Sequence, residues 1–333
     1  MKNIAVNGFG RIGRCLVRAI YEQNREKEFK IAAINASGDP SVHAHLLKYD
    51  SVHGTFEADI ESDEDYIIIN GDKIKLIAER NPAKINWQEL GADIIMECTG
   101  AFKKHEDASL HIKTAKAKKV LISSPAPDPD ATIVFGVNNQ DLKSQDNIIS
   151  VGSCTTNCLA PVAKVLDEKF GIETGYMTTI HSYTRDQEIL DSKHKDLRRA
   201  RACNMSIIPT STGAAKAIGL VLPQLIGKLD GNAVRVPTPN VSMVDLTFVP
   251  KKTASVQEIN KAIEQASNNE LKNVLRYCDE PLVSKDFNHD PHSSIFDAGL
   301  TKSINNGKLI RVASWYDNEW GFSCRMLDVA SIL

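Results

Sequence analysis

The sequence predicts an α/β protein with two differently built halves. In the first half, short β-rich segments alternate with helical patterns, which is typical of a mainly parallel sheet with helices on both faces. After residue 153, strands follow one another with few helices between them, which is typical of an antiparallel sheet. The 333 residues are enough for two hydrophobic cores. We therefore expect an amino-terminal, Rossmann-type doubly wound domain and a second, α+β domain with an antiparallel sheet.

The elements of the first half follow from hydrophobic periodicity and turn chemistry. A short apolar strand leads into a glycine-rich segment that opens the first helix, and Asn70-Gly71 has the composition of a hairpin turn. In order, we predict strand 4–6, helix 11–25, strand 30–34, a hairpin of strands 66–69 and 73–77, strand 93–97, helix 108–116, and strands 119–122, 132–135 and 148–151.

The second half contains fewer helices and one long irregular stretch. We predict helix 154–170, strand 175–181, a polar and basic stretch without period at 182–207, helix 213–222, strands 232–236, 241–248 and 310–316, and a last helix at 319–332. This gives a dinucleotide-binding domain at 1–152, a second domain at 153–316, and a carboxy-terminal segment 317–333 that packs back on the first domain.

Composition excludes several classes of protein. The 40 Lys and Arg residues nearly balance 42 Asp and Glu residues, so neither a disordered chain nor a polyanion-binding protein fits. The arginines of segment 197–201 have no aromatic residues between them, so we expect no nucleic-acid partner. No apolar run reaches the 18 or so residues of a membrane span, so we expect no membrane partner.

The cysteines indicate a reducing compartment, and the expected location is the cytoplasm. Seven cysteines is an odd number, and they are scattered along the chain. Cys154 and Cys158 form a single C-x-x-x-C pair without a second pair at metal spacing, so we expect no metal.

A dinucleotide site is indicated at the amino terminus. Gly8, Gly10 and Gly13 form a G-x-G-x-x-G pattern after a strand and at the start of a helix. This arrangement lets the backbone approach a pyrophosphate at the helix amino terminus, although a glycine-rich turn without a ligand is the simpler alternative.

Cofactor choice depends on the end of the second strand. An NAD site normally has an acidic residue there, but this chain has Asn35 and Ala36, and Asp39 lies beyond a glycine. A neutral surface admits the 2′-phosphate of NADP. The alternatives for NAD are that Asp39 reaches back or that Asn35 alone is sufficient.

A reactive thiol is indicated where the two halves meet. Cys154 lies at the start of a helix, whose N–H groups favour a thiolate and can hold an oxyanion. Ser153 and Thr155 flank it with hydroxyl groups. The alternative is a buried cysteine in a capped helix. His181, at the end of a strand, is the candidate base, whereas histidines 43, 45, 53, 105, 111 and 194 have charged neighbours and are expected at the solvated surface.

Two further segments can hold an anion. Ser211 and Thr212 precede Gly213 at a predicted helix start, where hydroxyl and N–H groups coincide. Arg235 lies in an apolar strand, where an unpaired cation is costly, so an anionic ligand or a carboxylate must meet it.

Seven motifs together resemble the phosphorylating glyceraldehyde-3-phosphate dehydrogenase family over essentially the whole chain. The most specific is S-C-T-T-N-C, which lies at the joint between the two halves. The motifs occupy residues 7–14, 153–158, 181–187, 196–202, 211–217, 235–239 and 315–321.

The resemblance implies a mechanism and a set of binding residues. Cys154 attacks the aldehyde to give a thiohemiacetal, His181 activates the thiol and takes the hydroxyl proton during hydride transfer to NAD or NADP, and inorganic phosphate cleaves the resulting thioester to 1,3-bisphosphoglycerate. The second domain is then the catalytic domain, and the protein is a homotetramer with the loop 182–207 at subunit contacts.

The implied cofactor contacts are Gly8, Gly10, Arg11, Ile12, Gly13, Asn35, Ala36, Arg80, Ser123 and Asn318, of which Asn318 reaches the nicotinamide carboxamide. Thr184 and Arg235 bind the phosphate of glyceraldehyde 3-phosphate, and Ser153, Thr155, Thr212 and Gly213 bind the attacking phosphate.

Departures from the family pattern keep the cofactor and the metabolic direction open. NAD-type members carry Asp at the position of Ala36 and Pro at the position of Lys193, which Ser192 precedes here, so the chain resembles members that accept NADP. Both glycolysis and gluconeogenesis remain open.

Three rival functions remain. The closest is erythrose-4-phosphate dehydrogenase, which the chain resembles at 286–293; however, that enzyme tends to lose the Thr-Gly-Ala-Ala motif, which is intact here at 212–215. In a Cys–His hydrolase or acyltransferase, the glycine pattern and Asn318 would have no function. A dinucleotide-sensing module would have no purpose for Ser153 and Cys154.

Overall fold

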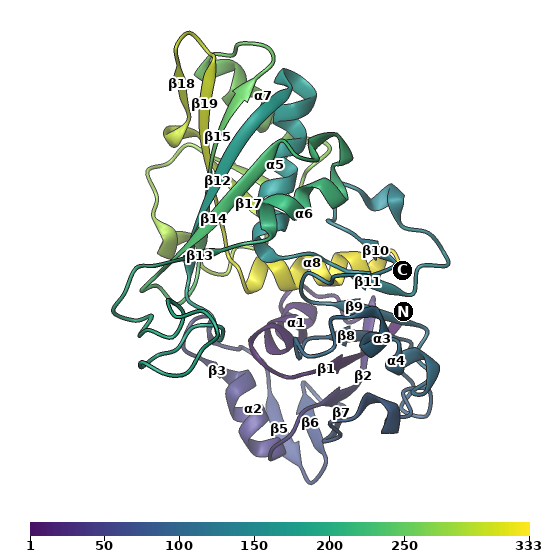
Figure 1. Cartoon of the computed structure of the whole chain (residues 1–333). Helices are drawn as coiled ribbons and strands as arrows, with labels where there is room; N and C mark the ends of the chain where they lie inside the picture. Colours follow the sequence, from purple (N-terminus) through teal and green to yellow (C-terminus); the bar gives the residue numbers. More distant parts are fainter. The chain divides into compact units, whose positions relative to one another are not determined.

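The structure, a computed structural model, describes residues 1–333 and divides them into two compact units. Unit 1 contains Met1–Ile133, Asn139–Gly152 and Ser323–Leu333, and unit 2 contains Val134–Asn138 and Ser153–Phe322. Each unit is built around its own large sheet (Figure 1). The chain passes from unit 1 to unit 2 between Gly152 and Ser153, directly before Cys154.

Unit 1 has a nine-stranded sheet in the order β10-β11-β9-β8-β1-β2-β7-β6-β5. Seven neighbouring strands, from β10 to β7, pair in parallel with β1 in the interior, and β6 and β5 continue from β7 as an antiparallel meander. This confirms the predicted doubly wound domain and the hairpin at Asn70-Gly71. The strands are β1 (Lys2–Asn7), β2 (Phe29–Asn35), β5 (Ile60–Asp63), β6 (Tyr66–Ile69), β7 (Asp72–Ile77), β8 (Ile94–Glu97), β9 (Lys119–Ile122), β10 (Ala131–Thr132) and β11 (Ile148–Ser150), with β3 (Tyr49–Asp50) and β4 (Gly54–Thr55) as a separate pair.

The helices of unit 1 differ from the prediction in two places. α1 (Arg11–Glu22) begins at the predicted residue and ends three residues before the predicted end. The single helix predicted at 108–116 is wrong, because α3 (His105–Ala108) and α4 (Leu110–Lys113) are separate short helices. α2 (Pro40–Lys48) was not predicted, although Asp39 caps it and proline occupies its first position. The strand predicted at 132–135 is reduced to β10, because the chain leaves unit 1 after Ile133.

Unit 2 has an eight-stranded sheet in the order β13-β14-β12-β15-β19-β17-β16, with β18 paired to β19. The predicted antiparallel pairing is correct for most neighbours, but the sheet is mixed, since β12 pairs in parallel with β14 and β16 with β17. The strands are β12 (Ile172–Ser182), β13 (Ile208–Ser211), β14 (Leu229–Val236), β15 (Ser242–Pro250), β16 (Leu275–Cys278), β17 (Ser294–Asp297), β18 (Lys302–Ile304) and β19 (Leu309–Tyr316).

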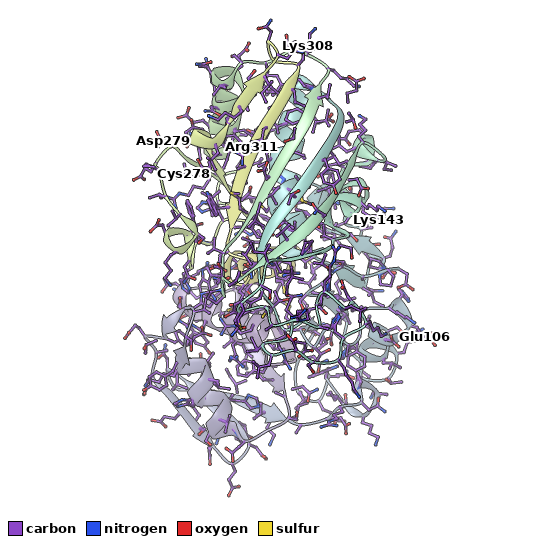
Figure 2. The ribbon with its side chains drawn as sticks, turned by 60° about the vertical axis from the view of Figure 1, so that its left-hand side comes forward. Glu106, Lys143, Cys278, Asp279, Lys308 and Arg311 are labelled. Carbon is purple, nitrogen blue, oxygen red and sulfur yellow. The ribbon has the colours of Figure 1, made fainter.

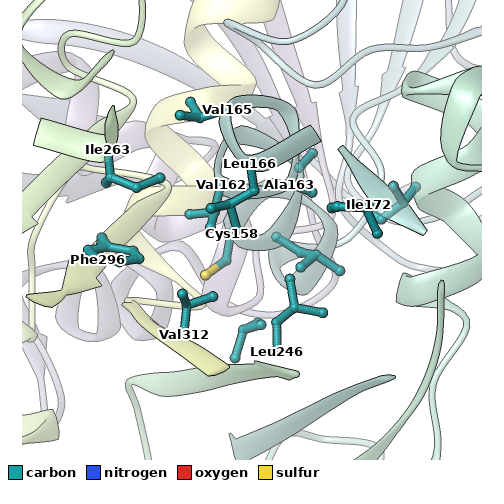
Figure 3. Close-up of a cluster of buried hydrophobic side chains, with 14 of the residues drawn as sticks. Cys158, Val162, Ala163, Val165, Leu166, Ile172, Leu246, Ile263, Phe296 and Val312 are labelled. Carbon is teal, nitrogen blue, oxygen red and sulfur yellow. The ribbon is translucent and has the colours of Figure 1, made fainter. Parts of the chain in front are cut away.

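One face of the unit 2 sheet packs on helices and forms the main core. Cys158, Val162 and Leu166 of α5 (Cys154–Phe170) belong to one buried apolar cluster with Leu246 of β15 and with other side chains from the sheet and from α7 (Val256–Asn268) (Figure 3). Cys158 is fully buried in this core, as predicted for a packing residue. α6 (Ala214–Val221) belongs to the same cluster. The part of α5 that follows its first turn is therefore packed in a rigid core, which fixes the start of this helix.

Polar pairs stabilise the strands away from this core. Arg311 of β19 (Figure 2) forms a two-point ion pair with Asp245 of β15, at 3.0 Å and 2.6 Å. The last helix, α8 (Trp320–Ser331), begins in unit 2 and continues into unit 1, where Asp328 pairs with Arg25 at 2.7 Å. None of the helices is both long and apolar enough to span a bilayer.

Candidate active site

Cys154 is the first residue of α5, in the helix start that the sequence predicted. Ser153 caps the helix, since its Oγ accepts a hydrogen bond of 2.9 Å from the N–H of Thr156. The thiol is half-buried, and both the N–H and the hydroxyl of Thr155 donate to it. The helix start therefore surrounds the sulfur with hydrogen-bond donors, which favour negative charge on it.

His181 is the next-to-last residue of β12, and the structure places it against Cys154. Its Nε2 lies 3.5 Å from the Sγ of Cys154. Its Nδ1 lies 2.7 Å from the carbonyl oxygen of Ser182 and 2.8 Å from a guanidinium nitrogen of Arg235, which also donates to that carbonyl at 2.9 Å. His181 and Arg235 are register partners on neighbouring parallel strands. The sheet therefore fixes the imidazole, the guanidinium and the carbonyl of Ser182 relative to one another.

The electrostatics favour an uncharged resting pair. Burial raises the pKa of the Cys154 thiol, although the Arg235 charge and the Thr155 donors oppose this effect. Burial, and then the Arg235 charge, lower the pKa of His181 to about 3. His181 is therefore a neutral imidazole beside a thiol, in reach to accept its proton when the sulfur attacks an electrophile.

A buried tyrosine that the sequence did not indicate supports this pair. Tyr316 ends β19, and its hydroxyl lies 2.9 Å from the Oγ1 of Thr155 and 2.8 Å from that of Thr179. Its ring also packs edge-on against His181, with 5.8 Å between the ring centroids. Thr155, predicted to bind phosphate, is buried and turned toward Tyr316.

The other predicted anion-binding residues lie in two loops and one strand of unit 2. Thr184 is held by Gln187, whose Oε1 accepts from its N–H at 2.9 Å and from its hydroxyl at 3.2 Å. Gln187 is 4% exposed, and its Nε2 has no partner within the protein. Thr212 and Gly213 precede α6, where Thr212 Oγ1 accepts from Ala214 N–H at 3.2 Å. Gln187 was not among the residues predicted from the sequence.

The Nε of Arg235 is also buried without a partner. An unpaired buried N–H of a cation is costly, and a bound anion would satisfy it. This observation supports the predicted role of Arg235 in anion binding.

The glycine-rich turn of unit 1 has the shape that a dinucleotide requires. A Cβ at Gly8, whose φ is +96°, would lie 2.7 Å from the N of Thr99, and a Cβ at Gly13 would lie 2.2 Å from the carbonyl of Gly8. At Gly10, by contrast, no protein atom lies within 4 Å of the Cβ position. Gly10 also offers no side chain to cap α1. Protein packing thus explains two of the glycines, whereas no packing contact within the protein explains the third.

Arg11 uses its side chain within the protein. Its guanidinium pairs with Asp50, and although burial opposes ionisation, the hydrogen bond from Arg11 and those from the loop backbone hold the pKa of Asp50 at about 2. Arg11 and Ile12 lie in the first turn of α1, so what they offer a dinucleotide is the main chain of that turn.

The end of β2 is neutral. The side chain of Asn35 donates to Asn7 at 2.6 Å and to the carbonyl of Glu79 at 2.7 Å. Asp39 caps α2 by accepting from the N–H and hydroxyl of Ser41, so the alternative in which it reaches back is not what the structure shows. Ala36 follows β2 directly. Of the remaining predicted contacts in unit 1, Arg80 is exposed after β7 and Ser123 is half-buried after β9.

A buried polar network next to the turn escaped the sequence analysis. Glu97, 1% exposed, accepts from the Asn7 amide, from the N–H and hydroxyl of Thr99, and from His111, whose Nε2 lies 3.3 Å away. Trp87 donates its indole N–H to His111 Nδ1 at 3.0 Å, which leaves the imidazole proton on Nε2. The expectation that His111 lies at the surface is wrong, since it is fully buried.

We expect Glu97→Gln to destabilise the protein by about 1–3 kcal/mol, because one of its acceptor atoms becomes an N–H that faces other donors. Urea unfolding measures this change. Glu106→Gln is the matched control: Glu106 is exposed on α3 (Figure 2), and we expect a change within about 0.5 kcal/mol. Equal effects of the two substitutions would contradict the importance of the network.

Comparisons with known proteins agree with this arrangement. The sequence matches the family model "Glyceraldehyde 3-phosphate dehydrogenase, NAD binding domain" over residues 2–105 and "Glyceraldehyde 3-phosphate dehydrogenase, C-terminal domain" over residues 153–318. It is 56% identical to the plasmid-encoded glyceraldehyde-3-phosphate dehydrogenase of Cupriavidus necator over 331 residues, covering 99% of this chain and 98% of the relative. It is 54% identical to that of Pseudomonas aeruginosa, covering 99% and 97%. It is 50% identical to glyceraldehyde-3-phosphate dehydrogenase 2 of Bacillus subtilis, covering 98% and 95%.

Proposed function

This chain belongs to the glyceraldehyde-3-phosphate dehydrogenase family, and we propose that Cys154 and His181 carry out its aldehyde chemistry. The chain is an NAD-dependent dehydrogenase that oxidises glyceraldehyde 3-phosphate, with NAD or NADP as its cofactor. The observation that supports the roles of the two residues is the 3.5 Å separation between the thiol and the imidazole at a helix start.

The first half of the reaction follows from this geometry. As the Cys154 sulfur bonds to the aldehyde carbon, the thiol proton passes to His181 Nε2 and then to the former carbonyl oxygen, which gives a thiohemiacetal. His181 then takes the hydroxyl proton while a hydride leaves the same carbon, and a thioester remains on Cys154. A nicotinamide cofactor, when bound, would supply the acceptor for that hydride. In the tautomer with its proton on Nδ1, His181 donates to the carbonyl of Ser182, and its unprotonated Nε2 is the atom that takes part in both proton transfers.

In the second half, inorganic phosphate cleaves the thioester to 1,3-bisphosphoglycerate. Thr184 and Arg235 bind the phosphate of the substrate, and the orphaned Nε of Arg235 supports this assignment. Ser153, Thr155, Thr212 and Gly213 bind the attacking phosphate. In support, Gly213 caps α6 without a side chain, and of the first N–H groups of that helix only that of Ala214 has a side-chain acceptor, Thr212 Oγ1. Since Ser153 and Thr155 bond to Thr156 and Tyr316, their hydroxyl groups reorient when phosphate binds.

A phosphate-omission experiment tests this assignment. Without inorganic phosphate, and with sulfate in its place, we expect about one equivalent of reduced cofactor per protein, because the thioester accumulates. Adding phosphate restores continuous turnover and forms an acyl phosphate. Full-rate turnover to a free acid without phosphate would contradict phosphorolysis. Running the same assay with erythrose 4-phosphate compares kcat/KM for the rival substrate.

We expect NADP to serve at least as well as NAD. Ala36 supplies no carboxylate, and Asp39 is held by Ser41 at the start of α2, so the acidic residue that usually excludes a 2′-phosphate is missing from the end of β2. A kcat/KM preference for NAD above roughly 100-fold, or about 2.7 kcal/mol, would refute this prediction. Ala36→Asp should shift the preference toward NAD, whereas Ala78→Asp, exposed after the neighbouring strand β7, is the matched control.

We also propose a homotetramer located in the cytoplasm. Apolar side chains of the loop between β12 and β13 are exposed by half or more, which supports burial of the loop between subunits; they are Ile189, Leu190, Leu197, Met205 and Ile207. All seven cysteines are free thiols, which supports a reducing compartment.

A further inference from the structure

Gln187 is a buried residue of the loop between β12 and β13, and three hydrogen bonds join it to Thr184. Its Oε1 accepts from the N–H of Thr184 at 2.9 Å and from the hydroxyl of Thr184 at 3.2 Å. Its own N–H donates to the carbonyl of Thr184 at 2.9 Å. The loop therefore forms a closed turn in which the two side chains lie next to each other.

The segments on both sides of this turn are fixed to the sheet of unit 2. The N–H of Tyr183 donates to the carbonyl of Thr238, directly after β14, at 3.1 Å. Asp186 pairs with Arg199, whose Nε donates to the hydroxyl of Thr210 on β13 at 2.8 Å. The turn is therefore held at the end of the sheet where β12 and β14 finish, and it is not a free surface loop.

The main chain of Thr184 determines how the amide of Gln187 is oriented. The N–H of Thr184 needs an acceptor, and a rotated amide would direct its NH2 group at this N–H. Nε2 of Gln187 is consequently the atom without a partner, and it is buried. Because a buried N–H group without an acceptor is costly, this arrangement indicates an acceptor that a ligand supplies.

Arg235 provides a second unpaired donor at the same end of the sheet. Its guanidinium donates to the carbonyl of Ser182, two residues before Thr184, at 2.9 Å, whereas its Nε is buried without a partner. Burial, and then the Arg235 charge, lower the pKa of the Arg199 guanidinium, so the two cations act on each other. Asp186 pairs with Arg199, and no carboxylate pairs with Arg235. Excess positive charge beside unpaired N–H groups favours a bound anion.

We propose that Gln187 is a further ligand of the substrate's phosphate, to which Nε2 donates beside Thr184 and Arg235 while Oε1 keeps Thr184 in place. This inference rests on the proposed binding of that phosphate by Thr184 and Arg235, and it adds a neutral donor to the site. The contribution of Gln187 is therefore confined to aldehydes that carry a phosphate group, which makes it a specificity-determining residue.

The experiment compares kcat/KM for glyceraldehyde 3-phosphate with kcat/KM for glyceraldehyde, which lacks the phosphate and has the same reacting aldehyde group. Gln187→Met keeps the length of the side chain and removes the amide. Gln187→Glu keeps an acceptor for the N–H of Thr184 but places a carboxylate oxygen where Nε2 donates. The second variant thus separates the contact with the phosphate from the support of Thr184.

We expect Gln187→Met to lower kcat/KM for glyceraldehyde 3-phosphate about tenfold or more, and Gln187→Glu about 100-fold or more, mainly through KM. The value for glyceraldehyde should stay within about threefold of wild type, because Cys154 and His181 are untouched. Gln187→Met decides the result if the buried carboxylate of Gln187→Glu prevents folding. Gln265→Glu, on the exposed face of α7, is the matched control and should change neither value.

Two results would overturn this inference: equal losses with both aldehydes, or an unchanged kcat/KM for glyceraldehyde 3-phosphate in both Gln187 variants. Dissociation of the oligomer with unchanged selectivity between the aldehydes would also overturn it, since Nε2 would then face another subunit. Thr184→Val tests the proposed phosphate site separately. If Thr184→Val lowers kcat/KM only for glyceraldehyde 3-phosphate while the Gln187 variants do not, the inference fails and the proposed function stands.

Discussion

Cys154→Ala is expected to abolish turnover of glyceraldehyde 3-phosphate, with a loss in kcat of about 10⁴-fold or more. The substitution removes the only atom that the proposed mechanism bonds to the aldehyde carbon, and His181 alone cannot form the covalent intermediate. Dinucleotide binding should be preserved, because the glycine turn belongs to the separate unit 1. Steady-state kinetics and a titration of cofactor binding measure the two effects on one sample.

The matched control for this substitution is Cys278→Ala. Cys278 is a buried thiol on β16 of the same unit (Figure 2), where it contacts the carbonyl of Glu280 rather than an imidazole. We expect at most a modest stability loss and full kcat. Activity above about 1% of wild type in Cys154→Ala would show that the thiol is not the nucleophile.

Local sequence patterns predicted the catalytic cysteine and histidine and the glycine-rich turn of the candidate site. A cysteine at a helix start, a histidine at a strand end and three glycines between a strand and a helix are each signals within a few residues. The structure places Cys154 and His181 in these local settings and brings them together. The sequence could not show that contact directly, because it depends on the pairing of strands far apart in the chain.

The residues that escaped prediction make contacts only over long sequence distances. Trp87, His111 and Glu97 form one buried network although 24 residues separate Trp87 from His111 and 14 separate His111 from Glu97. His111 lies in a helical pattern with Lys113 and Lys116 close by in the sequence, which suggests a surface position. Its burial became visible only through the aromatic rings of Trp87 and Phe102 that cover it.

Strand direction was the main uncertainty in the second domain. The runs 232–236 and 175–181 are readable as strands, but whether they pair in parallel depends on the path of the 46 residues between β12 and β14, which include β13 and α6. α7, by contrast, had a readable start, because Ser255 and Glu258 form a capping box. α7 was therefore predictable from the sequence, although the predicted elements did not include it.

His181→Asn is expected to lower kcat by about 10²–10⁴-fold, the usual contribution of a general base. Asparagine retains a polar side chain but cannot accept the thiol proton at the position of Nε2. Cofactor affinity should stay within about twofold of wild type. His105→Asn is the matched control, because His105 is 41% exposed on α3 of unit 1, where it pairs with Asp130.

The pH dependence of the His181→Asn variant separates base catalysis from a general structural defect. Without the imidazole, the sulfur attacks only as a thiolate, after its proton has been released to solvent. Burial raises the pKa of the Cys154 thiol above its ordinary value, so the thiolate fraction below that pKa increases about tenfold with each pH unit. The variant should therefore recover rate as the pH rises, whereas the wild-type enzyme, with its proton acceptor in place, should change much less. A loss that is equally large at every pH would mean that His181 supports the structure of the site and does not accept the proton.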